Sequence, residues 1–73
     1  MNYKPIYRKL GERIEWLRKE KGMTQEQLAE KSNLHRAYFW DIEKGRNISI
    51  RTAYNIARAL DTTLSKLLDI KPN

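Results

Sequence analysis

The segment from His35 to Gly45, with the sequence HRAYFWDIEKG, brings together an arginine, three aromatic side chains and an acid. A guanidinium can donate two parallel hydrogen bonds to O6 and N7 of guanine, so Arg36 is the leading candidate for contact with a base edge. Ala37 offers a methyl-sized surface that suits a thymine methyl group. Tyr38 and Trp40 are further candidates for this contact surface, because a small domain rarely exposes large aromatics without a partner.

Each of these residues also has a second interpretation. Arg36 could contact a phosphate or be an ordinary surface charge, and Ala37 could serve helix propensity alone. Tyr38 could cover the edge of the core, and Trp40 could bind a protein instead of DNA. Asp41 could accept a hydrogen bond from cytosine N4, but an acid near DNA usually costs affinity, so a surface role is favoured.

Helical spacing decides which of these side chains face outward. At about 100° of rotation per residue, Phe39 and Ile42 fall on one side of a helix that begins at Arg36, and they are expected to face the core. The opposite, outward side carries Arg36, Ala37, Trp40 and Asp41. Tyr38 falls at the boundary between the two sides, so the aromatic run is expected to divide between fold and contact surface.

Two helices are predicted before this segment. The first has apolar residues that step by four, four and three: Ile6, Leu10, Ile14 and Leu17. Gly22 can end it as a left-handed cap. Thr24, with Gln27 three residues later, forms a capping-box pattern, so the second helix is expected to start at Thr24 and run to about Ser32.

The remaining pattern completes an all-α fold. Asn33 tolerates positive φ and supplies the turn before a third helix over about residues 36–44. Ser49 is expected to cap a fourth helix and Thr63 a fifth, which Pro72 ends. No segment alternates with period two, so we expect five short helices and no strands, in a single domain over residues 1–73 whose core spans about residues 6–70.

Charge and composition favour a polyanionic partner. The chain has 73 residues, with 15 Lys and Arg against nine Asp and Glu, which gives a formal net charge of +6 and a pI near 9.8. Such a balance suits nucleic acid. A domain of this size has a thin core, so a second subunit is an expected source of stability.

Several classes of function find no support in the residues. There is no cysteine and only one histidine, His35, so we expect no disulfide, no metal site and no cofactor. No nucleophile and base, phosphate-cradling loop or paired carboxylates can be assembled, so we expect neither an enzyme nor a small-molecule ligand. The chain lacks an apolar run of about 18 residues and a secretory signal, so we expect a cytoplasmic protein with no membrane contact.

The segment MTQEQLAEKSNLHRAYFWDIEKGR resembles the Cro/repressor-type helix-turn-helix domain of bacteria and phages, the Xre family, and the resemblance extends from about Gly11 to Leu68. The Thr-Gln start, the mid-helix Leu-Ala, the three-residue turn and the Ile-Glu-x-Gly ending have the family's spacing. The resemblance implies a lambda-repressor-like five-helix fold with the helix-turn-helix over about residues 24–44, binding double-stranded DNA. Asn33 replaces the usual glycine, and His35 replaces the usual hydroxyl cap.

The longer segment NLHRAYFWDIEKGRNIS further resembles controller proteins of restriction-modification systems. The matching positions are Asn33, Leu34, Arg36 and Tyr38, followed by Arg46, Asn47, Ile48 and Ser49. Trp40 departs from the pattern, where a small residue is usual. This resemblance implies a sequence-specific transcriptional regulator that binds a pseudo-palindromic operator as a homodimer. The alternatives are an antitoxin or a partner-regulated protein-interaction module with the same fold, and a small RNA binder.

The resemblance and the predicted helix ends also imply further contacts. Gln25 corresponds to a family residue that bonds a DNA phosphate and steadies the recognition helix. The full set of expected phosphate contacts is Thr24, Gln25, His35, Lys44, Arg46 and Asn47. In the family, an arginine of the first helix pairs with the glutamate that ends the third, which implies a structural ion pair between Arg18 and Glu43. The apolar residues near the last helix form a candidate dimer surface: Leu64, Leu67, Leu68 and Ile70.

Overall fold

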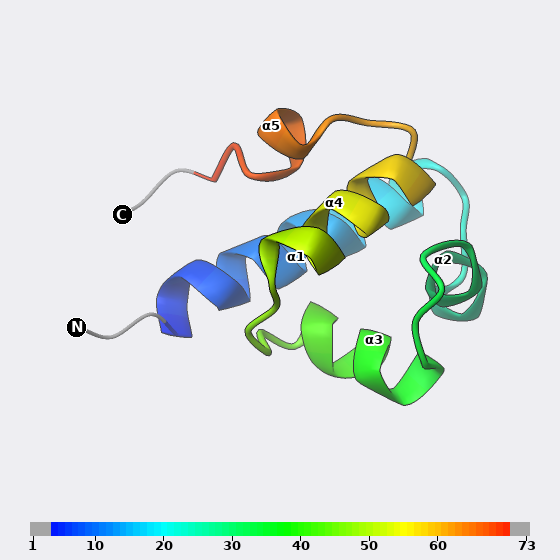
Figure 1. Cartoon of the computed structure of the whole chain (residues 1–73), viewed down its shortest axis with the longest axis horizontal. Helices are drawn as coiled ribbons and strands as arrows, with labels where there is room; N and C mark the ends of the chain where they lie inside the picture. The colour runs from blue at the N-terminus through cyan, green and yellow to red at the C-terminus, as the bar shows by residue number, and fades with distance from the viewer. Residues whose placement is uncertain (1–3, 71–73) are drawn as a thin grey trace.

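The computed structural model describes residues 4–70, which form five α-helices and no strand (Figure 1). In chain order they are α1 (Lys4–Glu20), α2 (Gln25–Lys31), α3 (Arg36–Glu43), α4 (Ile50–Ala59) and α5 (Leu64–Leu67). The predicted fold class and the number of helices are confirmed. The first helix begins two residues earlier than its apolar stripe. The expectation that the last helix ends at Pro72 is wrong, because α5 ends at Leu67 and residues 68–70 are not helical.

The helix ends follow local sequence signals. The Thr24 hydroxyl accepts a hydrogen bond from the Gln27 backbone N–H at 3.0 Å, and the Gln27 side chain accepts one from the Thr24 N–H at 2.8 Å, so the predicted capping box is present. Ser49 and Thr63 cap α4 and α5 in the predicted way. Asn33, with φ of 58°, supplies the turn between α2 and α3.

The core lies where the five helices meet, and α4 contributes to it by packing against α2 and α5. Helix α3 packs against α1 and α2, while α5 packs against α4 and α1, and Figure 1 shows α5 above and α3 below α1 and α4. The largest fully buried side chains come from all five helices: Ile14, Leu28, Phe39, Ile42, Ile56, Leu60 and Leu67. Burying each side chain of this size stabilises the fold by about 1.5–3 kcal/mol.

Three of these burials test the sequence predictions directly. Phe39 and Ile42 are buried, so the division of the aromatic segment into an inner and an outer side is confirmed. The expectation that Leu67 lies on an exposed dimer surface is wrong, because its side chain is completely buried. Helix α5 is a single turn of four residues, and Leu67 is its one fully inward position.

Gly11 fixes how closely α1 and α3 approach each other. A Cβ atom at Gly11 would lie 2.6 Å from the carbonyl oxygens of both Ile42 and Glu43. Backbone carbonyls cannot withdraw like a flexible side chain, so only glycine permits this approach. The contact seats the C-terminal end of α3 on α1 and thereby sets the position of its outer face.

Candidate nucleic-acid interface

The outer face of α3 presents the residues that were expected to contact bases. Arg36 and Ala37 are exposed, and Tyr38 is half-buried at the edge of the core. Trp40 is 53% exposed, so its indole is not part of the core. Helix α3 is therefore amphipathic, with its inner side held in the protein and its outer side free to enter a groove.

A buried hydrogen-bond cluster anchors this helix. Arg18 donates from Nε to Glu43 Oε2 at 2.8 Å and from Nη2 to Glu43 Oε1 at 3.3 Å, while its Nη1 donates to the Met23 carbonyl at 2.8 Å. The expected ion pair between Arg18 and Glu43 is thus present, with the two residues only 7% and 8% exposed. It joins α1, the turn before α2 and the end of α3.

Gln25 completes the anchor from the first position of α2. Its Nε2 donates to Glu43 Oε1 at 2.9 Å, so this side chain steadies α3 within the protein. An amide nitrogen carries two hydrogens, and Gln25 is only half-buried, so one donor remains for a phosphate. The neighbouring Thr24 is exposed, and its hydroxyl oxygen already accepts the cap hydrogen bond.

Cations stack on Trp40 of the outer face and on Tyr38 at its edge. The Lys44 ammonium lies 4.1 Å from the centre of the Trp40 ring, and the Arg46 guanidinium lies 4.7 Å from the centre of the Tyr38 ring. At exposed sites each such contact is worth about 0.5–1 kcal/mol. The structure therefore brings two residues expected to contact phosphates against two expected to contact bases.

The remaining phosphate candidates lie at the two ends of α3. His35 is the N-cap of α3, and its side chain makes no cap hydrogen bond. This agrees with the resemblance, in which a Ser or Thr hydroxyl usually stands at this position. Asn47 is exposed in the loop that follows α3. Arg46, in the same loop, also contacts Asp41, with Nη1 and Oδ2 3.4 Å apart.

Arg36 has a partner that sequence reasoning missed. Its Nη1 lies 2.9 Å from Oε2 of Glu26, in the first turn of α2. The two residues lie on different helices and are ten positions apart. Spacing rules for one helix compare positions three or four apart, so they give no signal for such a contact.

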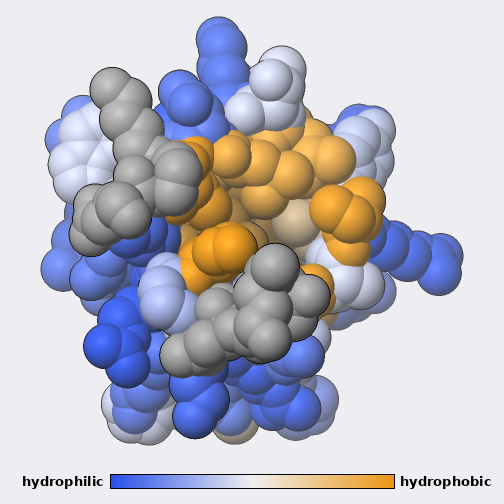
Figure 2. All heavy atoms as spheres, turned by 90° about the vertical axis from the view of Figure 1, so that its left-hand side faces the viewer, coloured by the Kyte–Doolittle hydropathy of each residue, from blue (hydrophilic) through white to orange (hydrophobic). Residues whose placement is uncertain are grey.

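An apolar surface lies at the end of the molecule where α1 begins, on the left of Figure 1. Figure 2 shows hydrophobic residues gathered on this face. A hollow of about 270 Å³ lies here, between α1, the start of α4 and the residues after α5. Ile6, Ile50, Leu68 and Ile70 are among its lining residues, and Ile50 is 65% exposed. Of the expected dimer residues, the exposed Leu68 and the half-buried Ile70 line this hollow, whereas Leu64, also half-buried against the core, does not.

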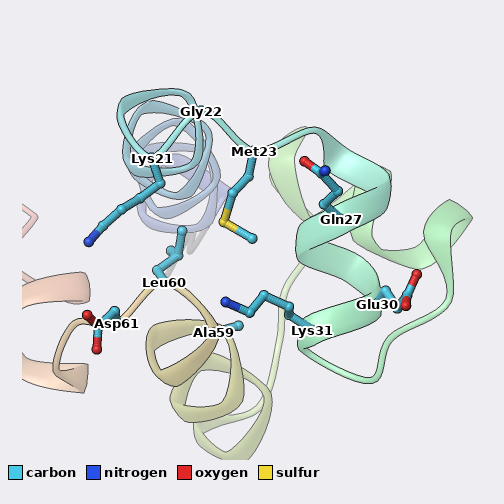
Figure 3. Close-up of a pocket in the computed structure, with 9 residues that line it drawn as sticks. All are labelled: Lys21, Gly22, Met23, Gln27, Glu30, Lys31, Ala59, Leu60 and Asp61. Atoms are coloured by element: carbon cyan, nitrogen blue, oxygen red, sulfur yellow. The ribbon is translucent and has the colours of Figure 1, made fainter.

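A second hollow, of about 590 Å³, opens between the α1–α2 turn, α2 and the end of α4 (Figure 3). Lys21 and Lys31 line it together with Glu30 and Asp61, so it has no single sign of charge. No residue of α3 takes part in it. Across residues 4–70, no group of three or more His, Cys, Asp or Glu could hold a metal ion, and no helix is long and apolar enough to cross a membrane.

Comparison with known proteins gives the same fold and motif. A helix-turn-helix family profile, HTH_3, matches residues 14–67. The control protein C.SmaI of Serratia marcescens is 43% identical over 60 residues, which are 81% of this chain and 71% of that protein. The immunity repressor of Bacillus phage phi105 is 47% identical over 60 residues, but the match spans only 42% of its length.

Solved structures agree with these sequence matches. The restriction-modification controller protein C.AhdI from Aeromonas hydrophila superposes with a TM-score of 0.81 at 40% identity, covering 84% of this chain and 94% of that one. The biofilm regulator SinR, solved in complex with DNA, superposes with a TM-score of 0.76 at 37% identity, covering 82% and 98%. The chain therefore belongs to the HTH_3 family of helix-turn-helix proteins, the Xre type that its sequence resembles.

Proposed function

We propose that this protein is a transcriptional regulator that binds a specific double-stranded DNA sequence with the outer face of α3. The observation that carries the proposal is the arrangement of that face. Arg36 and Trp40 are exposed on it, Lys44 and Arg46 flank it, and the buried Arg18–Glu43 pair holds its inner side. A rigid, cationic helix face of this kind fits the major groove of DNA.

The residues of this face divide into two kinds of contact. Arg36, Ala37, Tyr38 and Trp40 are proposed to contact base edges, with Arg36 supplying about 1–3 kcal/mol of discrimination if it pairs with guanine. The proposed phosphate contacts surround them: Thr24, Gln25, His35, Lys44, Arg46 and Asn47. Phosphate contacts fix the register of the helix in the groove, and base contacts supply specificity. The alternative of a protein-interaction module is not favoured, because Trp40 shares its face with Arg36 and Lys44.

We further propose that the protein acts as a homodimer through the apolar face formed by Ile6, Ile50, Leu68 and Ile70. Exposed apolar patches of this kind mark sites of protein association. A twofold axis through the patch would pair it with itself and give two α3 helices to one operator. In dimers of this class, the two recognition helices contact half-sites about 34 Å apart.

The relatives suggest the biological setting. C.SmaI and C.AhdI are control proteins, and C.AhdI is described as a restriction-modification controller. By this similarity we propose that the protein controls expression of a restriction-modification system from the cytoplasm. SinR, the relative solved with DNA, supports DNA as the primary partner.

Selection of bound duplexes from a random pool at about 150 mM salt tests the proposal, because this salt concentration suppresses counterion-driven binding. We expect a motif of two inverted half-sites. A single half-site would refute the dimer, and the absence of any enriched sequence would refute specific DNA binding.

Fluorescence can test the role of Trp40 within this function. The chain has two tryptophans, so the W16F variant leaves Trp40 as the one indole reporter. We expect its emission to change on addition of the selected duplex. The W40F variant, which retains Trp16 on α1, is the matched control. If only the W40F variant changed its emission, DNA would contact the protein near Trp16 and not near Trp40.

A further inference from the structure

The contact between Glu26 and Arg36 crosses the turn of the helix-turn-helix. Glu26 lies in the first turn of α2, and Arg36 is the first residue of α3. Nη1 of the guanidinium lies 2.9 Å from the carboxylate oxygen Oε2. Both side chains are exposed, at 71% for Arg36 and 69% for Glu26, so the pair sits on the surface that would approach DNA.

Stability does not explain this contact. Exposed ion pairs contribute little to folding. The turn is already held by other groups, because the Leu34 N–H donates to the Ala29 carbonyl at 2.8 Å and the buried Ser32 hydroxyl donates to the Leu28 carbonyl at 2.7 Å. What Glu26 adds is a partner that favours one direction for the long Arg36 side chain.

The geometry leaves the guanidinium able to recognise a base. A guanidinium has five N–H donors in one plane. Within residues 4–70, the Arg36 guanidinium donates one hydrogen bond, from Nη1 to Oε2 of Glu26. The edge formed by Nε and Nη2 therefore keeps its donors, and this edge can form the two parallel hydrogen bonds to guanine O6 and N7.

The charge of Glu26 acts in the same direction. An arginine with no partner is attracted equally to any phosphate, and such contacts carry no sequence information. A carboxylate 2.9 Å away offsets that attraction and repels nearby phosphates. The binding free energy of Arg36 is then most favourable at a site that offers both guanine acceptors, O6 and N7, in the plane of the guanidinium.

We infer that Glu26 is a specificity-determining positioning residue: it holds Arg36 in the orientation that recognises a base and disfavours its contact with phosphate. This inference rests on the proposed DNA-binding function. It assigns Glu26 no contact with DNA of its own. Its effect is therefore predicted to appear in the ratio of specific to non-specific affinity and to vanish when Arg36 is removed.

The chain supplies a closely matched control. Glu30 follows Glu26 by one turn on α2 and lines the same surface hollow as Glu26 and Arg36. It is exposed and has no ion pair within the described part of the chain. E30Q therefore removes the same charge from the same hollow without touching the Arg36 contact, whereas E26Q removes the charge of the partner itself.

The test measures binding of the wild type, E26Q and E30Q to the selected duplex, to duplexes with single base-pair changes, and to an unrelated duplex. We expect E26Q to lose about fivefold or more of its discrimination at one base pair, the least that a good bidentate contact supplies. Its affinity for the unrelated duplex should stay equal or rise, with a salt slope steeper by up to about one. E30Q should retain wild-type discrimination.

Three outcomes would overturn the inference: unchanged discrimination in E26Q, an equal loss in E30Q, or a uniform loss of affinity accompanied by a lower melting temperature. The double variant with R36A adds a second requirement, since E26Q should have no effect on discrimination once Arg36 is absent. Binding by the wild-type protein distinguishes failure of the proposed function from failure of the role of Glu26. If it selects no sequence, the proposed function fails, and if it selects one that E26Q leaves intact, only the role of Glu26 fails.

Discussion

Replacement of Glu43 by alanine tests whether α3 is held by its buried anchor. The substitution removes three hydrogen bonds, two from Arg18 and one from Gln25. It also leaves the Arg18 guanidinium, which is 7% exposed, with only its bond to the Met23 carbonyl. Breaking a buried ion pair in this way costs about 3–5 kcal/mol.

This cost is large for so small a domain. At about 0.05–0.15 kcal/mol per residue, a chain of 73 residues is expected to have a total stability of about 4–11 kcal/mol. Glu43→Ala should therefore remove about a quarter or more of the free energy of unfolding. Each kcal/mol lost should lower the melting temperature by about 4–8 °C.

The assay is urea denaturation followed by circular dichroism, because both tryptophans are exposed and report poorly on the core. A loss of less than about 1 kcal/mol in the free energy of unfolding would refute the anchoring role, because a solvent-exposed ion pair contributes that little. If Glu43→Ala lost DNA affinity but kept its free energy of unfolding, the structural role of Glu43 would also be refuted, because the loss would indicate a direct contact with DNA. The double variant R18M/E43L replaces the pair by apolar side chains of similar size and should recover much of the stability.

Four further predictions address the approach of the helices, the two kinds of DNA contact and the dimer. Gly11→Ala should destabilise the fold by about 1–3 kcal/mol in the same urea assay, because its Cβ would meet two carbonyl oxygens at 2.6 Å; an unchanged midpoint would contradict the close approach. Arg36→Ala should relax specificity at one base pair in competition binding, and an equal loss on all sequences would exclude base contact. Arg46→Ala should weaken all duplexes alike and lower the salt slope by about one, and an unchanged slope would remove Arg46 from the phosphate contacts. Ile50→Glu should convert the dimer to monomer in sedimentation equilibrium while leaving the helical content intact, and a persistent dimer would place the interface on another face.

Local signals in the sequence predicted the five helices and the starts of α2, α3, α4 and α5, but not the end of α5, which comes at Leu67 instead of Pro72. The capping box at Thr24 and the turn at Asn33 involve neighbours in the chain, so their residue types alone indicate the geometry. The contact of Lys44 with Trp40 is also local, since the two residues are four positions apart. The helical spacing of α3 likewise separated Phe39 from the outer side chains correctly.

Contacts between helices were not predictable in the same way. The close approach at Gly11 depends on where the end of α3 crosses α1, and a lone glycine in a helix does not reveal its neighbour. The pair of Glu26 with Arg36 depends on the angle between α2 and α3. Leu67 was misplaced because an apolar residue near the chain end fits a core and an interface equally well until packing decides.

Stability and the proposed DNA recognition are assigned to opposite sides of the same helix. Phe39 and Glu43 hold α3 inside the protein, whereas Arg36 and Trp40 lie on its exposed side. A substitution on the outer side therefore leaves the core contacts intact, and this explains how a large indole at position 40 is compatible with a fold in which a small residue is usual there. The same separation predicts that changes at positions 36 and 40 alter the DNA sequence that is bound before they alter the free energy of unfolding.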